Sequence, residues 1–239
     1  MREEASLQAI IEESNDIVFF GGAGVSTESG IPDFRSVEGL YSQKYQYPPE
    51  VILSHRFYLS NPADFFDFYK DKMLCLNAKP NAAHYKLSEM EKIGKLKAVI
   101  TQNIDGLHQA AGSENVLELH GSVHRNYCEH CHKLFSGKDI LEGAKIPTCG
   151  CGGIIKPDVV LYGENLDNVT MQKSIDAIKK ADVLIVGGTS LAVYPAAGLL
   201  DYYSGNKLVL INKSTTPLDR RADLLIAGNI GEVFSKINL

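Results

Sequence analysis

The chain has 239 residues, of which 44% are hydrophobic and 22% charged, and a formal net charge of -5. A chain of this length can bury one substantial core, or a core and a small lobe. The negative charge, without any run of five basic residues, argues against a dedicated nucleic-acid binder. No segment approaches the roughly 20 apolar residues of a membrane span, and the charged start lacks an apolar signal core. We therefore expect a cytoplasmic protein.

Hydrophobic periodicity predicts helices and strands in alternation. Short apolar runs predict buried strands at 17–20, 96–100, 116–119, 159–162, 183–186, 208–211 and 224–226. Amphipathic segments predict helices at 3–14, from the cap Asn81 to about residue 93, and near 170–180 and 195–203. Strands of this kind separated by helices indicate an α/β fold, with a Rossmann-like parallel sheet covered on both faces.

The composition changes twice along the chain, and these changes predict the organisation of the domain. Residues 37–78 are rich in aromatics and proline, which predicts a side lobe of short helices. Residues 125–157 contain the clustered cysteines and predict a small zinc module. The Rossmann-like core then comprises about 1–36, 79–124 and 158–239, all within a single domain.

Four cysteines form two closely spaced pairs, Cys128-x2-Cys131 and Cys149-x-Cys151. Four thiolates on two tight turns predict one closed, structural Zn²⁺ site. The second pair is one residue shorter than usual, but the neighbouring glycines allow a tighter turn. Disulfides and unreactive free thiols are the alternatives, but paired cysteines in a chain without secretory features more often bind a metal. His130 and His132 are alternative ligands, but we expect them to be solvated.

Polar segments follow several predicted strands at the point where each strand ends. Since ligands of a parallel sheet bind outside the carboxyl ends of its strands, these segments predict one site. They are Gly22-Ala23-Gly24, Gln102-Asn103, His120, Gly188-Thr189-Ser190 and Asn212.

The glycine-rich turn matches the dinucleotide fingerprint only in part. Gly22-x-Gly24 would let the backbone approach a pyrophosphate, but Thr27 occupies the third glycine position. No strand ending in an acidic residue follows about 20 residues later, as that fingerprint requires. This argues against a hydride-transferring dehydrogenase and favours a cofactor held for chemistry at its ribose.

Five motifs together resemble the sirtuin family of NAD-dependent protein deacylases. The resemblance runs from about Asp16 to Val233, and the lack of extensions beyond the catalytic core is similar to the compact prokaryotic members. The motifs are Gly22-Ala23-Gly24-Val25-Ser26 with 30–35 (GIPDFR), 101–108 (TQNIDGLH), His120-Gly121, the cysteine pairs and Gly188-Thr189-Ser190.

The resemblance implies roles for individual residues. His120, the general base, and Asn103 would be catalytic. NAD would be bound by Gly22, Ala23, Gly24, Phe34, Arg35, Gln102, Asn103, Ile104, Asp105, His120, Gly188, Thr189, Ser190 and Asn212. The acyl-lysine peptide would contact Val160, Leu161, Tyr162 and Val193, with 163–165 and 191–194 pairing with its backbone.

These roles agree with the chemistry that the resemblance implies. The acyl oxygen would attack the ribose as nicotinamide leaves, and a ribose hydroxyl would then need a base. A histidine with a pKa of about 6.5 suits that task near neutral pH. An aromatic side chain such as Phe34 would keep water from the reactive ribose. Asp105 would orient the carboxamide of nicotinamide.

One position bears on the choice of acyl group. Family members that prefer acidic acyl groups carry Tyr-x-x-Arg on a comparable helix, whereas this chain has Tyr69-x-x-Lys72. Lysine cannot form the planar fork with a carboxylate, so we expect acetyl to be preferred. Two alternatives stay open, a protein ADP-ribosyltransferase and a non-enzymatic NAD-binding module. We expect a monomer whose partners are acylated proteins, with no direct contact with nucleic acid or membrane.

Overall fold

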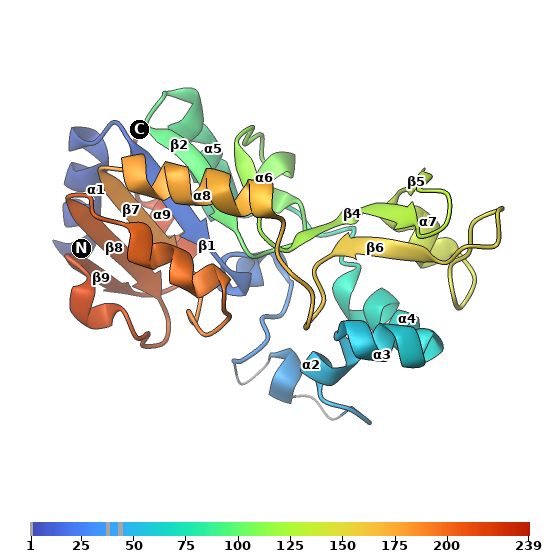
Figure 1. Ribbon diagram of the computed structural model, residues 1–239. Helices are drawn as coiled ribbons and strands as arrows, with labels where there is room; N and C mark the ends of the chain where they lie inside the picture. Colours follow the sequence, from blue (N-terminus) through green and yellow to red (C-terminus); the bar gives the residue numbers. More distant parts are fainter. Residues whose placement is uncertain (1, 37–38, 43–44) are drawn as a thin grey trace.

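A computed structural model describes residues 2–36, 39–42 and 45–239 (Figure 1). Its centre is a six-stranded parallel sheet in the order β3-β2-β1-β7-β8-β9. The chain fills one half of the sheet outward from β1 and then the other half outward from β7. The carboxyl ends of β1 and β7 therefore flank the switch point, where parallel sheets bind ligands. The strands are β1 (Ile17–Gly21), β2 (Leu96–Thr101), β3 (Val116–Glu118), β7 (Val183–Gly187), β8 (Lys207–Asn212) and β9 (Leu224–Ala227).

Helices cover both faces of this sheet. Phe19 and Val209 point to one face, where they pack with α1 (Arg2–Glu13), α5 (Ala82–Lys92) and α9 (Ile230–Ser235). Phe20 and Leu210 point to the other face, against α8 (Asn168–Lys180) and a 3-10 helix (Ala196–Tyr202). Residues on β1 and β8 alternate between the two cores because successive side chains of a strand point to opposite faces. The predicted α/β fold with a covered parallel sheet is confirmed.

Side-chain caps explain where two of these helices begin. Asn81 Oδ1 accepts a hydrogen bond of 3.0 Å from the Ala83 N–H at the start of α5, as the sequence predicts. Asp167 Oδ2 accepts one of 2.7 Å from the Thr170 N–H at the start of α8. The segment predicted as a helix near 195–203 is the 3-10 helix. Further 3-10 turns are Ala23–Val25, Thr27–Ser29, Leu40–Ser42 and Asp219–Arg221.

A second lobe lies beside the sheet, to the right in Figure 1. It contains an antiparallel sheet in the order β5-β4-β6, together with short helices. Phe65 and Tyr69 from the helices share one apolar core with Val123 and Ile155 from the sheet. The helices and the cysteine-bearing segment are therefore packed together. The elements of this lobe are α2 (Pro49–Ile52), α3 (His55–Ser60), α4 (Pro62–Phe68), a π-helical turn (Tyr69–Met73), β4 (Gly121–Cys128), β5 (Leu134–Phe135), α7 (Gly137–Glu142) and β6 (Ile155–Val159). The short helix α6 (Leu107–Ala110) packs instead on α5 of the sheet domain.

One predicted strand is wrong. Residues 159–162 were expected to extend the parallel sheet, but β6 ends at Val159 and pairs antiparallel with β4. Tyr162 instead makes an isolated bridge with Ser54. Apolar content alone does not distinguish a parallel core strand from a strand packed on a second core. The predicted domain boundaries remain a prediction, and those at residues 1 and 37 lie outside the described residues.

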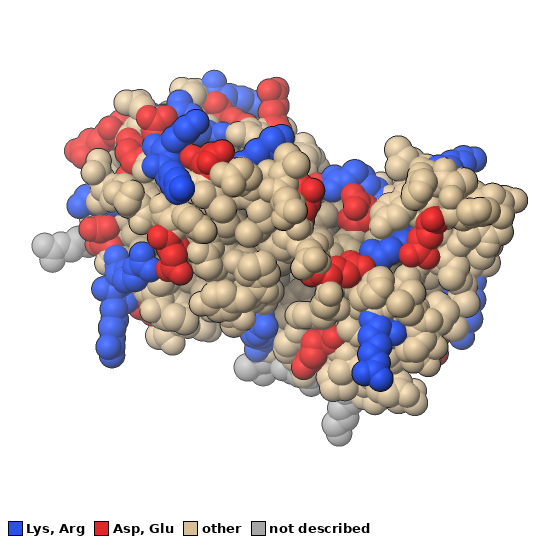
Figure 2. Space-filling view, in the orientation of Figure 1, with Lys and Arg blue, Asp and Glu red and all other residues tan. Residues whose placement is uncertain are grey.

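The charged side chains on the surface are mixed in sign. Lys and Arg side chains alternate with Asp and Glu side chains on the face shown in Figure 2, without a large area of one sign. Among the helices of the described ranges, none is long and apolar enough to cross a membrane.

Candidate functional site

A cleft of about 830 Å³ lies at the carboxyl edge of the parallel sheet, bounded on the far side by the second lobe. Loops after β1, β2, β7 and β8 form one wall, and Leu53, Tyr69 and Val160 contribute to the other. All residues predicted to bind the cofactor line this cleft, and so do four predicted to contact the peptide, whereas Asn165, Leu191 and Ala192 of the predicted backbone-pairing segments are not part of its lining. The predicted residues that line it are Gly22, Ala23, Gly24, Phe34, Arg35, Gln102, Asn103, Ile104, Asp105, His120, Val160, Leu161, Tyr162, Gly188, Thr189, Ser190, Val193 and Asn212.

The glycine-rich turn after β1 packs directly on the turn after β7. Gly24 N–H donates a hydrogen bond of 2.8 Å to Gly188 O. A Cβ atom on Gly24 would lie 2.8 Å from Gly188 Cα, and one on Gly188 would lie 2.4 Å from Val25 N. Gly188 also has a φ of 61°, a region that favours glycine. The two turns can meet only because both are glycine, and together they present backbone to the cleft.

A serine hydroxyl joins two of the predicted polar residues. Ser26 Oγ donates a hydrogen bond of 2.6 Å to Asp105 Oδ2 and accepts one of 3.0 Å from Asn103 Nδ2. Asp105 Oδ1 accepts a further hydrogen bond from Leu107 N–H. Ser26 is 1% exposed, so its hydroxyl is available mainly to these two side chains. The sequence contained Ser26 within its first motif, but nothing local to the motif showed that it holds Asn103 and Asp105.

His120 is held by a backbone carbonyl. Its Nδ1 lies 2.9 Å from Gln102 O. A carbonyl oxygen can only accept, so Nδ1 carries the proton and Nε2 of the neutral ring is the basic nitrogen. Burial lowers the pKa of His120 from its ordinary value, and the bond to Gln102 opposes part of that shift. The ring is therefore neutral at physiological pH, and its Nε2 atom is able to accept a proton.

The loop after β7 is tied to its neighbours on both sides. Thr189 N–H donates to Asn212 Oδ1 at 2.9 Å, and Gln102 Nε2 donates to Thr189 Oγ1 at 3.0 Å. Asn212 Nδ2 is buried without a hydrogen-bond partner among the described residues, and so is Asn229 Oδ1 after β9. A buried donor and a buried acceptor that line the cleft are positioned for a polar ligand. Asn229 was not predicted, although it follows the last strand just as Asn212 follows β8.

Phe34 and Arg35 lie in the segment that follows the 3-10 turn Thr27–Ser29, and both line the cleft. Arg35 Nη1 lies 3.4 Å from Ser190 Oγ, which joins this segment to the loop after β7. Phe34 packs edge-on against Tyr41, with 5.8 Å between the ring centroids. An aromatic ring and a cation therefore face the cleft together.

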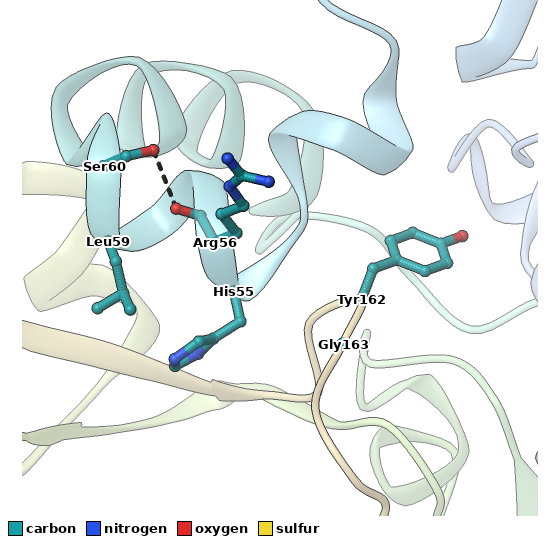
Figure 3. Close-up of a pocket in the computed structure, with 6 residues that line it drawn as sticks. All are labelled: His55, Arg56, Leu59, Ser60, Tyr162 and Gly163. Carbon is teal, nitrogen blue, oxygen red and sulfur yellow. Dashed lines mark hydrogen bonds between the residues drawn. The ribbon is translucent and has the colours of Figure 1, made fainter.

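Four residues predicted to contact the peptide, Val160, Leu161, Tyr162 and Val193, line the side of the cleft near the second lobe. Glu164 holds the first three in place, because its Oε2 accepts a hydrogen bond of 2.8 Å from Leu161 N–H. Its Oε1 lies 2.7 Å from His55 Nδ1, on α3. In Figure 3 the Tyr162 ring points away from His55 and Arg56. The Tyr162 carbonyl accepts a hydrogen bond from the His55 N–H at the start of α3, so the backbone is fixed there while the ring extends away from α3.

Tyr69 and Lys72 line the same cleft, one turn apart. Tyr69 is fully buried, stacks on Phe65 at 5.6 Å, and its hydroxyl has no hydrogen-bond partner within the described ranges. Lys72 Nζ forms an ion pair of 2.9 Å with Asp71, which raises the pKa of Lys72. The lysine is therefore already engaged with a carboxylate of its own turn.

The four paired cysteines converge in the second lobe. All of their sulfur atoms lie within 4.8 Å of one another, with 3.4 Å between Cys128 and Cys151 and 3.6 Å between Cys131 and Cys149. Sulfur ligands about 2.3 Å from a tetrahedral zinc would lie roughly 3.8 Å apart, so the cluster fits one Zn²⁺ ion. The five cysteines, all within the described part, are free of disulfides.

The short second cysteine pair is accommodated by glycine. Gly152 has a φ of 85°, and its N–H closes the turn on Cys149 O. A Cβ atom on Gly153 would lie 2.7 Å from the sulfur of Cys128. N–H groups of Cys131 and His130 point at that sulfur and lower the pKa of the Cys128 thiol. Low thiol pKa values favour the thiolate that zinc requires.

The Sir2 family model matches residues 22–195, which span the glycine-rich turn, the polar loops and the cysteine cluster. The chain belongs to the Sir2 family. It is 60% identical over 235 residues to an NAD-dependent protein deacetylase of Clostridium acetobutylicum, covering 97% of this chain and 96% of that protein. A protein of the same description from Clostridium tetani is 58% identical and covers 99% and 98%.

Solved Sir2 structures share the fold along nearly the whole chain. A Sir2 complex with a deacetylated p53 peptide and 3′-O-acetyl-ADP-ribose has a TM-score of 0.90 and 40% identity, covering 98% of this chain and 96% of that one. A Sir2 complex with a p53 peptide and NAD⁺ has a TM-score of 0.85 and 40% identity, covering 97% and 95%. The predicted family resemblance is confirmed.

Proposed function

We propose that this protein removes acetyl groups from lysine side chains of proteins and consumes NAD as co-substrate, releasing nicotinamide and O-acetyl-ADP-ribose. The observation that carries the proposal is the arrangement of His120 in the cleft, where burial and the bond to Gln102 leave Nε2 as a neutral base. Its Sir2 relatives described as NAD-dependent protein deacetylases support the same activity.

The residues that line the cleft are suited to bind an NAD molecule. The turns of Gly24 and Gly188 present backbone at the switch point of the sheet, which suits a pyrophosphate. Asn212 Nδ2 and Asn229 Oδ1 offer an unpaired donor and an unpaired acceptor, which suit the hydroxyls of a ribose. Arg35 adds a cation beside Ser190.

The residues then divide the work along the cleft. NAD supplies an activated ribose whose bond to nicotinamide breaks. Asn103 orients that ribose, and Asp105 orients the carboxamide of nicotinamide. Ser26 links the two side chains, so they are held in place before any ligand binds. Phe34 excludes water, and His120 accepts a proton at Nε2 from a ribose hydroxyl.

The substrate side of the cleft takes the acyl-lysine. Val160, Leu161, Tyr162 and Val193 surround the lysine, and segments 163–165 and 191–194 pair with the peptide backbone. Lys72 is held by Asp71, and Tyr69 presents only a neutral hydroxyl, so the cleft favours a neutral acetyl group. The cysteine cluster holds one structural Zn²⁺ ion. Action in the cytoplasm as a monomer is part of the proposal and rests on the sequence alone.

Mass spectrometry of a reaction with NAD and an acetyl-lysine peptide tests the proposal. We expect the peptide to lose its acetyl group as nicotinamide and O-acetyl-ADP-ribose form, and His120→Ala to abolish all three changes. A peptide that keeps its acetyl group while a protein gains the mass of ADP-ribose would instead indicate an ADP-ribosyltransferase. NAD binding without nicotinamide release would indicate a binding module.

A further inference from the structure

Two tyrosine hydroxyls meet beside the cleft, of which only Tyr162 lines it. The Oη atoms of Tyr41 and Tyr162 lie 2.8 Å apart, although the residues are separated by 121 positions. Tyr41 belongs to the segment that carries Phe34 and Arg35, whereas Tyr162 belongs to the segment that lines the acyl-lysine side. This hydrogen bond is therefore a direct connection between the two halves of the proposed site.

The Tyr41 ring is built into the cofactor side. Its N–H donates to Phe34 O at 2.8 Å, its ring packs edge-on against Phe34, and the Arg35 guanidinium lies 5.4 Å from its centroid. Arg35 in turn reaches Ser190 on the loop after β7. A shift of the Tyr41 ring would consequently move the aromatic and cationic groups that face the cleft.

Tyr162 is built into the substrate side through its backbone. Its N–H donates to Leu53 O and its carbonyl accepts from His55 N–H, both at 3.0 Å. The side chain stays 40% exposed and points away from His55 (Figure 3). Because the backbone is fixed, the position of the Tyr162 hydroxyl depends only on the rotation of its own side chain and on its hydrogen bond with Tyr41. Burial, together with the bond to Tyr162, raises the pKa of Tyr41, so its hydroxyl stays protonated.

We propose that Tyr41 and Tyr162 are positioning residues whose hydroxyl pair couples binding of the acyl-lysine peptide to binding of the dinucleotide. A hydrogen bond between two segments is strongest when both segments are ordered. A peptide paired with 163–165 would order the ring of Tyr162, and a dinucleotide beneath Phe34 and Arg35 would order Tyr41. Each ligand then tightens the other by the same factor, because such coupling is reciprocal.

This inference rests on the proposed function, since it takes the peptide and dinucleotide as ligands of the two sides. Catalysis by His120 does not itself require that peptide binding and dinucleotide binding be coupled. The ring of Tyr162 would be replaced without loss of packing by phenylalanine, which lacks only the hydroxyl. The coupling can therefore be removed while both halves of the cleft keep their shape.

Calorimetric titration of the zinc-loaded full chain with ADP-ribose tests the coupling, because ADP-ribose lacks the nicotinamide leaving group. The measured quantity is the factor by which a saturating acetyl-lysine peptide tightens ADP-ribose binding. We expect Tyr41→Phe and Tyr162→Phe each to reduce that factor about fivefold, the size of one hydrogen bond, and the double variant to reduce it no further.

Tyr203→Phe is the matched control. Its hydroxyl bonds to Asp182 O and Lys207 O at the opposite edge of the sheet, so the variant loses hydrogen bonds of similar kind without touching the cleft. We expect its coupling factor to equal that of the wild type. A purely structural role of the pair would lower the melting temperature and leave the factor unchanged.

The outcomes separate this inference from the proposed function. A wild type that deacetylates the peptide, with both single variants retaining the full coupling factor, would overturn the inference alone. So would losses that add in the double variant, because two independent effects do not form a pair. A wild type that releases no nicotinamide from NAD and acetyl-lysine peptide would overturn the proposed function.

Discussion

The hydroxyl of Ser26 lies 2.6 Å from Asp105 Oδ2, and Ser26 itself is almost completely buried. A hydroxyl has one proton, which goes to the carboxylate, and its lone pair accepts the amide of Asn103. Two residues from the loop after β2 are thereby fixed by one residue from the turn after β1. Such preorganisation is what positions a reacting group without further loss of entropy.

Ser26→Ala should therefore lower kcat/KM for NAD without unfolding the protein. The variant leaves Asn103 Nδ2 and Asp105 Oδ2 without their common partner, which costs roughly 1–3 kcal/mol, or about a 5-fold to 150-fold loss of kcat/KM. Steady-state kinetics measure this loss. Ser29→Ala is the control, since the Ser29 hydroxyl accepts from Asn81 and contacts neither residue. Equal kinetics of the two variants would contradict the role of Ser26.

The activity of the wild type should fall on the acid side with a midpoint below pH 6.5. His120 acts as a base in its neutral form, and burial lowers its pKa, so the neutral form persists to a more acidic pH than in a free histidine. Activity is consequently retained through neutral pH and lost as the pH falls through the lowered pKa. A profile of kcat/KM from about pH 5 to 9 measures the midpoint, with zinc content checked at each pH. A midpoint above 6.5 would argue against His120 as the base.

Removal of zinc should unfold the second lobe and abolish activity. The cysteine cluster is next to the apolar core that this lobe shares with the helices lining the cleft, and Cys149 packs against that core. We expect chelation, or Cys131→Ser, to lower the melting temperature by at least about 5 °C, or roughly 1–2 kcal/mol for a chain of this size.

Elemental analysis should give one zinc per chain in the wild type. Cys75→Ser should leave that ratio unchanged, because Cys75 lies outside the cluster. A stable and active protein without zinc would show that the four cysteines serve another purpose.

The wild type should turn over acetyl-lysine at least about tenfold faster than succinyl-lysine, and Asp71→Asn should narrow that ratio. The substitution removes the ion pair that occupies Lys72, which leaves the ammonium for an acyl carboxylate. An exposed ion pair contributes up to about 1 kcal/mol, so a change of up to about fivefold is expected. Competition between the two peptides measures the ratio.

Asp67→Asn is the control for that experiment, because Asp67, on the neighbouring helix α4, forms a comparable surface ion pair with Lys145. Comparable turnover of both acyl groups by the wild type would defeat the acyl preference altogether.

Much of the fold follows from patterns that are local in the sequence. Short apolar runs such as 17–20 and 208–211 coincide with β1 and β8, and Asn81 caps α5 as expected. Strand 159–162 was misplaced because Val159 and Leu161 pack on the core of the second lobe, which periodicity does not identify. The shared core of the helices and the cysteine segment was not predicted for the same reason.

The sequence by itself determined which polar residues follow parallel strands, which cysteines are paired and which family the motifs resemble, because each is a matter of residue type and spacing. Only the tertiary structure decided that Ser26 joins Asn103 to Asp105, that Nε2 of His120 is the free nitrogen and that Tyr41 meets Tyr162. These contacts join residues 18 to 121 positions apart. Their geometry depends on how separate turns pack, and no short stretch of sequence encodes that packing.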